Sequence, residues 1–240
     1  MDARILIARM ILALGLAMLI GIAGHYRIIG RRNFAHSGKK FRVYSTGVRI
    51  NHWVAAISGT LFTVTGLVML LSSAFDGERG VAFGVIAHLS WRVHAAAAAV
   101  FILPALIMLV NWGSQMLPRR YDIGWLKTAG GYLLRRRTTV KAGKFNAGQK
   151  AWFWLATLGG ALMALSGIVM FFDVGGIGFQ HVVARIHELA GGAVFAMFTV
   201  HVYMSVIAIK GSLSSMVSGE KSEDELATMH RIYYDELEKS

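Results

Sequence analysis

Five long apolar stretches constrain the fold of this 240-residue chain more than any other feature of its sequence. They lie at residues 5–24, 53–72, 93–112, 151–172 and 187–209. Each approaches the ~20 consecutive apolar residues that a helix needs to cross the hydrocarbon core of a bilayer. Charged residues make up only 16% of the chain, against roughly 25% in ordinary soluble domains. The sequence therefore predicts an all-α integral membrane protein.

The first apolar stretch allows two interpretations. It contains Arg9 and follows a basic start, as a secretory signal peptide does. However, the segment that follows, "GIAGHYRIIGRR", has no A-x-A-like cleavage site. We therefore expect an uncleaved transmembrane helix at the N-terminus.

Positive charge is concentrated in two of the four loops between these stretches. The basic residues of the two loops are Arg27, Arg31, Arg32, Lys39, Lys40, Arg42 and Arg49, and then Arg119, Arg120, Lys127, Arg135, Arg136, Arg137, Lys141, Lys144 and Lys150. By the positive-inside rule both loops are cytoplasmic and the two nearly neutral loops face the other side. The net charge of +12 thus marks membrane topology, and we expect no nucleic-acid partner. The chain has no cysteine, which excludes thiolate-bound metals and clusters.

Four of the nine histidines lie at matched depths in this topology. His52 opens the second stretch on the cytoplasmic side, and His94 opens the third at the outer face. His187 and His201 share the fifth stretch, about 21 Å apart along a helix that rises 1.5 Å per residue and nearly on one face. The topology therefore pairs His94 with His187 on the outer side and His52 with His201 on the cytoplasmic side.

Two facing imidazoles inside a helix bundle can occupy both axial positions of a haem iron. The sequence thus predicts a four-helix transmembrane bundle that binds two haems, with an extra N-terminal transmembrane helix. The alternative is that each histidine is hydrogen-bonded within a packed interface. Histidines alone can bind zinc or copper, but the helix interiors contain no Asp, Glu or Cys that would complete such a cluster. Small residues after His94 ("HAAAAAV") and His187 ("HELAGGAV") would leave room for a flat macrocycle, although close helix packing uses the same residues.

Three arginines stand close before the proposed ligands, namely Arg49, Arg92 and Arg185. They are candidates either for haem propionates, through charge-assisted hydrogen bonds, or for interfacial anchors.

The other five histidines are weaker candidates. We expect His88 and His181 to lie in the two nearly neutral loops, and we do not favour a cofactor role for either of them. His25, His36 and His230 fall outside or at the edges of the apolar stretches, where we expect solvated or interfacial side chains.

Several motifs together carry a family resemblance. "RINHWVAAISGTLFTVTGL", "WRVHAAAAAVF", "GKFNAGQK", "RIHELAGGAVFAMFTVHVYMSV" and "KGSLSSMVSG" occur in this order. From about residue 49 onward the chain resembles the gamma subunit of membrane-bound respiratory formate dehydrogenase. This diheme cytochrome b family shares features with the b cytochromes of hydrogenases and thiosulfate reductases.

The resemblance implies four core helices and two b haems, on the same two histidine pairs. It also implies a site for menaquinone or ubiquinone beside the cytoplasmic haem. Asn146 and Gln149 of "KFNAGQK" would offer hydrogen bonds there, Gly148 would allow close approach, and His201 would lie alongside. From the sequence alone Asn146 could equally be a helix N-cap.

The resemblance further implies a formate:quinone oxidoreductase complex in a bacterial cytoplasmic membrane. A periplasmic catalytic subunit with a molybdenum or tungsten cofactor would oxidise formate. An iron–sulfur subunit would pass the electrons to this chain, which would deliver them to quinone, and the heterotrimer could form a higher oligomer. The alternatives are a cytochrome b of a hydrogenase or another periplasmic dehydrogenase and, in a different class, a haem-free membrane anchor or transporter subunit.

Two parts of the chain depart from the family pattern. The N-terminal helix is additional to the four-helix core, and the tail "MHRIYYDELEKS" matches only loosely. We therefore expect residues 1–48 to form the N-terminal helix and a basic loop, and residues 49–212 the cytochrome core. Residues 213–240 would form a cytoplasmic tail that is amphipathic or bound to a partner.

Overall fold

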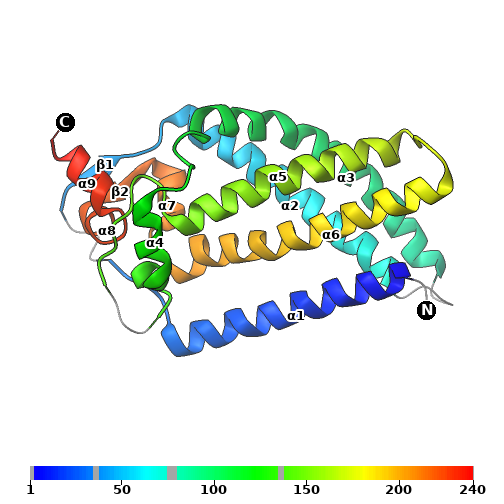
Figure 1. The fold of residues 1–240 in the computed structure, drawn as a ribbon, viewed down its shortest axis with the longest axis horizontal. Coiled ribbons are helices and arrows are strands. Elements are labelled where there is room, and N and C mark those ends of the chain that lie inside the picture. The colour runs from blue at the N-terminus through cyan, green and yellow to red at the C-terminus, as the bar shows by residue number, and fades with distance from the viewer. Residues whose placement is uncertain (1–2, 35–37, 75–79, 135–137, 240) are drawn as a thin grey trace. The chain divides into compact units, whose positions relative to one another are not determined.

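The computed structural model describes residues 3–34, 38–74, 80–134 and 138–239, which are mainly helical (Figure 1). The long helices are α1 (Ala3–Ile29), α2 (Thr46–Ala74), α3 (Gly80–Trp112), α5 (Ala147–Phe171) and α6 (Ile177–Val202), and α6 continues into the π-helical turn η2 (Tyr203–Ala208). Within these described residues, five helical spans are long and apolar enough to cross a membrane. The predicted class, an all-α multi-pass membrane protein, is confirmed.

The chain divides into two compact units, and the first consists mainly of sections of the long helices. It comprises Met1–Ile20, Trp53–Ile107 and Leu155–Met197. In this unit α1 packs closely on α6: a Cβ added to Gly192 would lie 3.2 Å from Ile11, and one added to Gly15 would lie 3.4 Å from Phe195. Gly192 of "HELAGG" therefore serves helix packing, one of the two roles that its sequence context allowed.

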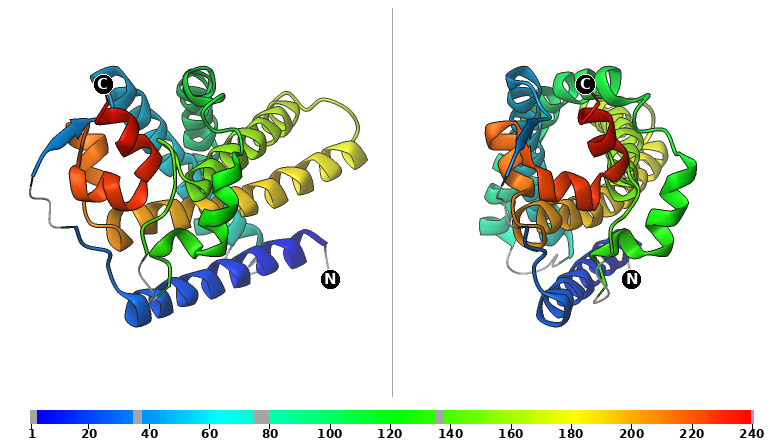
Figure 2. Two further views of the ribbon diagram at one scale, coloured as in Figure 1. Left: turned by 60° about the vertical axis from the view of Figure 1, so that its left-hand side comes forward. Right: turned by 90° about the vertical axis from the view of Figure 1, so that its left-hand side faces the viewer.

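The second unit adds short elements to sections of the same helices. It comprises Gly21–His52, Met108–Trp154 and Phe198–Ser240. The short elements are β1 (Lys40–Arg42), α4 (Arg120–Lys127), η1 (Ala129–Gly131), α7 (Ser212–Ser218), β2 (Glu220–Ser222), α8 (Glu223–Met229) and α9 (Arg231–Leu237). The strands β1 and β2 pair antiparallel with Phe41 opposite Lys221, and α8 and α9 lie beside them (Figure 2). Strands of three residues are too short to show an alternating pattern, so they could not be predicted from the sequence.

The C-terminal segment is part of the core of the second unit. Leu226 of α8 is fully buried in a cluster that includes Phe41, Tyr44, Trp112 and Phe145. The segment expected to be amphipathic or partner-bound thus packs on its own chain. The apolar face of α8 could not be recognised beforehand because a helix of two turns shows almost no periodicity.

His230 is deeply buried, so the expectation of a solvated or interfacial side chain was wrong. Only 1% of the residue is exposed, and its Nδ1 lies 2.9 Å from the carbonyl oxygen of Gly143. Burial, followed by the positive charge of Lys221, lowers the pKa of His230 from 6.5 to about 3. The imidazole is therefore neutral in the folded protein at physiological pH.

Acid should destabilise the second unit through His230. Because the folded pKa lies below the unfolded value, the contribution of neutral His230 is complete above pH 6.5 and is lost as the pH falls from 6.5 towards 3. The loss can reach about 1.4 kcal/mol per pH unit for one such group. Thermal unfolding of the detergent-solubilised protein at pH 7 and pH 5 should show a smaller drop in Tm for His230→Asn than for the wild type. Equal drops would contradict this assignment.

Candidate functional site

The first unit brings together two of the four histidines predicted as ligands. The rings of His94 on α3 and His187 on α6 have centroids 6.1 Å apart and planes inclined at 60°. A metal ion midway between them would lie about 3 Å from each ring centre, as expected when an imidazole nitrogen binds a metal at ~2 Å. The separation therefore suits one metal with two axial imidazoles.

The hydrogen bonds of His94 leave one ring nitrogen available for a metal. Its Nδ1 lies 2.9 Å from the carbonyl oxygen of Phe62 and 3.3 Å from the hydroxyl of Thr65, both on α2. A carbonyl can only accept, so Nδ1 carries the proton and Nε2 keeps a lone pair. Metal-ligating histidines usually donate their second ring N–H in this way, which fixes tautomer and orientation.

His187 has the corresponding arrangement on another helix. Its Nδ1 lies 2.9 Å from the hydroxyl oxygen of Ser166 on α5. Ser166 already donates its own proton to the carbonyl of Leu162 at 2.7 Å, so it accepts from His187. The lone pair of His187 therefore also resides on Nε2.

A hydroxyl residue followed by glycine recurs opposite both rings. Thr65 and Gly66 face His94, and Ser166 and Gly167 face His187. A Cβ added to Gly66 would lie 3.2 Å from Cε1 of His94, and one added to Gly167 would lie 3.5 Å from Cε1 of His187. Both glycines thus let the imidazoles approach the neighbouring helix. These supporting residues could not be recognised from the sequence, because the dipeptides "TG" on α2 and "SG" on α5 are too short to stand out.

The second unit contains the other predicted pair, His52 on α2 and His201 on α6. The two side chains lie close enough to interact electrostatically. The ring of His201 stacks on Trp152 of α5, with centroids 5.0 Å apart and planes inclined at 17°. Trp152 was not among the predicted site residues, because a tryptophan near a membrane edge is commonly an interfacial anchor.

The three arginine candidates differ in their surroundings. Arg92 and Arg185 are exposed. Arg49 donates from Nη1 to the carbonyl of Val217 and from Nη2 to the hydroxyl of Thr46 at 3.0 Å. It therefore ties the start of α2 to the end of α7. His88 and His181 were expected in loops, but they lie within α3 and α6, which begin earlier than predicted, and both are exposed. His36 lies outside the described residues.

The candidate quinone residues Asn146 and Gln149 form a capping box at the start of α5. The Oδ1 of Asn146 accepts from the backbone N–H of Gln149 at 3.0 Å, and Oε1 of Gln149 accepts from the backbone N–H of Asn146 at 2.9 Å. The N-cap alternative for Asn146 is thus present. Gly148 lies against the indole of Trp125, since an added Cβ would meet Cη2 at 3.0 Å.

A buried ion pair fixes α4 to this first turn of α5. The ammonium of Lys150 lies 2.8 Å from Oδ2 of Asp122, and both side chains are almost wholly buried. The same oxygen accepts from the backbone N–H of Arg119 at 2.7 Å. Lys150 was counted beforehand only as a loop charge, because its pairing with Asp122 depends on the tertiary fold.

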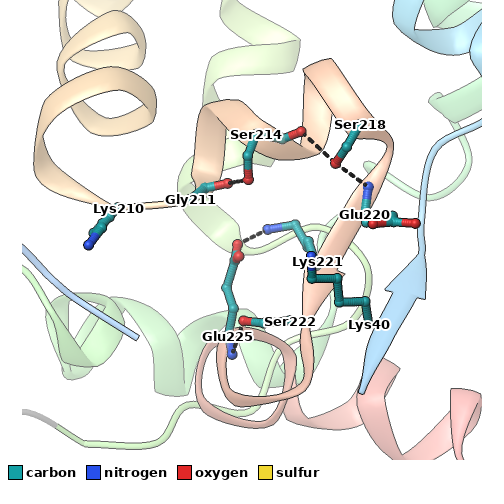
Figure 3. A pocket seen from close by; sticks show the side chains of 9 residues that line it. All are labelled: Lys40, Lys210, Gly211, Ser214, Ser218, Glu220, Lys221, Ser222 and Glu225. Carbon is teal, nitrogen blue, oxygen red and sulfur yellow. Dashed lines mark hydrogen bonds and ion pairs between the residues drawn. The ribbon is translucent and has the colours of Figure 1, made fainter. Parts of the chain in front are cut away.

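The second unit also has a polar hollow of about 450 Å³ (Figure 3). It is lined by Lys40, Lys210, Gly211, Ser214, Ser218, Glu220, Lys221, Ser222 and Glu225. Lys221 and Glu225 form a buried ion pair within it. None of the four candidate ligands is among these lining residues, so the hollow shares no residue with the two histidine pairs.

Comparison with known proteins identifies the family. The chain matches the prokaryotic cytochrome b561 family over residues 43–219 and belongs to it. A b-type cytochrome family implies haem b as the cofactor. The matched range contains all four candidate ligands.

Three similar proteins are each named as a cytochrome b556 subunit of formate dehydrogenase. The formate dehydrogenase cytochrome b556(fdo) subunit of Escherichia coli K12 is 27% identical over 201 residues, which cover 82% of this chain and 93% of that protein. The nitrate-inducible formate dehydrogenase cytochrome b556(Fdn) subunit of the same strain is 26% identical over 203 residues, 80% of this chain and 89% of that protein. The formate dehydrogenase cytochrome b556 subunit of Haemophilus influenzae is 26% identical over 181 residues, 73% of this chain and 74% of that protein.

Proposed function

We propose that this chain is the cytochrome b subunit of a formate dehydrogenase complex and passes electrons through two b haems to quinone. The observation that carries the proposal is the pair His94 and His187, 6.1 Å apart. Each ring is held by a bond to Nδ1 that leaves Nε2 for a metal. The family match and the names of the relatives support the same assignment.

The residues that would hold the haems follow from these pairs. His94 and His187 would ligate one haem, and His52 and His201 the other. Bound haem supplies reversible one-electron transfer, and the chain's side chains set the axial ligands and their orientation. Thr65, Phe62 and Ser166 would orient the first pair, and Trp152 would hold the ring of His201. Arg92 and Arg185 are exposed and could meet propionates, whereas Arg49 is already bonded to Val217.

The direction of transfer follows from the distribution of basic loops. By the positive-inside rule they support a topology in a bacterial cytoplasmic membrane with the C-terminus in the cytoplasm and the N-terminus in the periplasm. An iron–sulfur subunit would then deliver electrons from a molybdenum or tungsten formate-oxidising subunit to the His94/His187 haem. His52 and His201 would hold the haem beside the proposed quinone site, where menaquinone or ubiquinone would be reduced with protons taken from the cytoplasm.

The proposed quinone site comprises Asn146, Gly148, Gln149 and His201. Its support is the resemblance of "KFNAGQK" to the family's quinone loop, together with the stacking of Trp152, six residues after Asn146, on His201. Asn146 would then combine two roles, as the N-cap of α5 and as a hydrogen-bonding group for quinone.

Substitutions at Asn146 should separate these two roles. Asn146→Ser retains an N-cap oxygen but removes the amide, so we expect nearly unchanged Tm and a raised KM for quinone. Asn146→Ala removes both the N-cap oxygen and the amide, so it should also lower the free energy of unfolding by about 1 kcal/mol. Thermal unfolding and quinone-reduction kinetics of both variants would decide. An Asn146→Ser variant with wild-type KM would limit the residue to capping.

The electron donor decides between formate dehydrogenase and the related complexes. We expect native membranes containing the tagged chain to show haem reduction by formate under anaerobic conditions, and a formate-oxidising subunit should co-purify. Reduction by hydrogen but not by formate would instead assign the chain to a hydrogenase complex.

A further inference from the structure

The end of the N-terminal helix is attached to the turn that directly follows His201. Helix α6 ends at Val202, and the chain continues as the π-helical turn η2, Tyr203–Ala208. Single π-helical turns are rare and occur frequently at functional sites. The segment that holds this turn, His25–Arg32, comes from the far end of the sequence and lies before the family match, which starts at residue 43.

His25 holds the first residue of the turn. Its Nδ1 lies 2.6 Å from the hydroxyl of Tyr203, and the two rings meet edge to face with centroids 5.7 Å apart. Its Nε2 lies 3.2 Å from the carbonyl oxygen of Leu133. Because that carbonyl can only accept, Nε2 carries the proton and Nδ1 accepts from the O–H of Tyr203. His25 is therefore bonded on both sides, and Tyr203 is only 6% exposed.

The basic residues after α1 hold the rest of the turn. Arg31 donates from Nε to the carbonyl of Ile207 at 2.7 Å. The backbone N–H of Arg32 donates to Ala208 at 2.7 Å, and the carbonyl of Arg32 accepts from Lys210 at 3.0 Å. The last carbonyls of a helix lack partners within the helix, so these donors take the place of a C-terminal cap.

We infer that His25 is a positioning residue that, with Arg31 and Arg32, fixes the orientation of His201 as a haem ligand. This inference rests on the proposed function, because it takes His201 to be a ligand. Tyr203 is two residues from His201, at the junction where the helix changes from α to π. Holding the tyrosine hydroxyl on one side and the terminal carbonyls on the other restricts rotation of the helix end. His25, expected from the sequence to be solvated or interfacial, thus acts on the position of His201 through Tyr203.

The test uses the purified holo-complex and measures the two haems separately. Redox titration and low-temperature EPR are recorded for His25→Leu, Tyr203→Phe and His25→Asn, and for Ile28→Ala as a control at an exposed position of the same helix. The haem assigned to His201 is identified as the one that His201→Ala loses. The His94/His187 haem serves as an internal reference in every sample.

We expect His25→Leu and Tyr203→Phe to shift the potential and the EPR signal of the His201 haem while the reference haem stays unchanged. His25→Asn retains an acceptor for Tyr203 and should restore much of the wild-type signal, and Ile28→Ala should match the wild type. Unchanged potentials and signals in both His25→Leu and Tyr203→Phe, with two haems bound, would overturn the inference. If His25→Leu fails to fold, Tyr203→Phe decides alone, since it removes only one hydroxyl. A wild-type chain without two haems would instead reject the proposed function.

Discussion

Replacing His187 with alanine should halve the haem content of the chain and stop formate from reducing the haem that remains. The ring centroids of His187 and His94 are 6.1 Å apart, a separation that allows both imidazoles to bind one metal. In the proposed topology this pair also lies on the side of the membrane where electrons enter the chain. Haem per chain is measured by pyridine haemochrome, and reduction by the formate-minus-oxidised difference spectrum of the complex.

The matched control is His181→Ala, an exposed histidine on the same helix. It should keep the wild-type haem content and formate reduction. A His187→Ala variant with full haem content, or one in which formate still reduces the remaining haem at the wild-type rate, would contradict the assignment of this pair.

Replacing His201 with alanine should have the opposite signature. The haem at His94 and His187 should still be reduced by formate, because its ligands belong to the other unit. Quinol formation should fall to background, because electrons no longer reach the proposed quinone site. Formate-dependent haem reduction and quinone reduction are measured on the same preparation, with His88→Ala, another exposed histidine, as the control.

Measurements on His201→Ala also show whether His201 is a haem ligand or only a packing residue. A histidine that only packed against Trp152 would leave the haem content unchanged when replaced. Two haems and normal quinone reduction in His201→Ala would therefore reject the proposed role of His52 and His201.

The membrane spans could be predicted because the constraint on them is local. A bilayer requires long uninterrupted apolar helices, and each predicted stretch overlaps a helix that is long and apolar enough to span. The meeting of His94 with His187 also followed from the sequence, because alternating topology and equal depth leave few partners for each histidine.

The supporting contacts could not be predicted because they depend on helix rotation and on segments distant in sequence. Nothing in the sequence shows that Thr65 faces His94 or that Ser166 faces His187. His25 is 178 positions from Tyr203, its hydrogen-bond partner. His25 was assigned to the interface or to solvent because it was judged by its position along the chain alone.

The buried C-terminal segment was missed for a related reason. The helix α8 is seven residues long, so the burial of Leu226 depends on partners such as Phe41 and Phe145 rather than on its own pattern. The burial of His230 follows from the same packing.

Haem stoichiometry of the purified chain tests the central claim most directly. The pyridine haemochrome assay gives haem, quantitative amino-acid analysis of the same sample gives protein, and EPR reports whether the ferric haems are low-spin with two axial imidazoles. We predict two haems b per chain, both low-spin. A chain purified from its native membrane in mild detergent without haem would be a haem-free membrane anchor, and a single haem would show that only one of the two histidine pairs is a ligand pair.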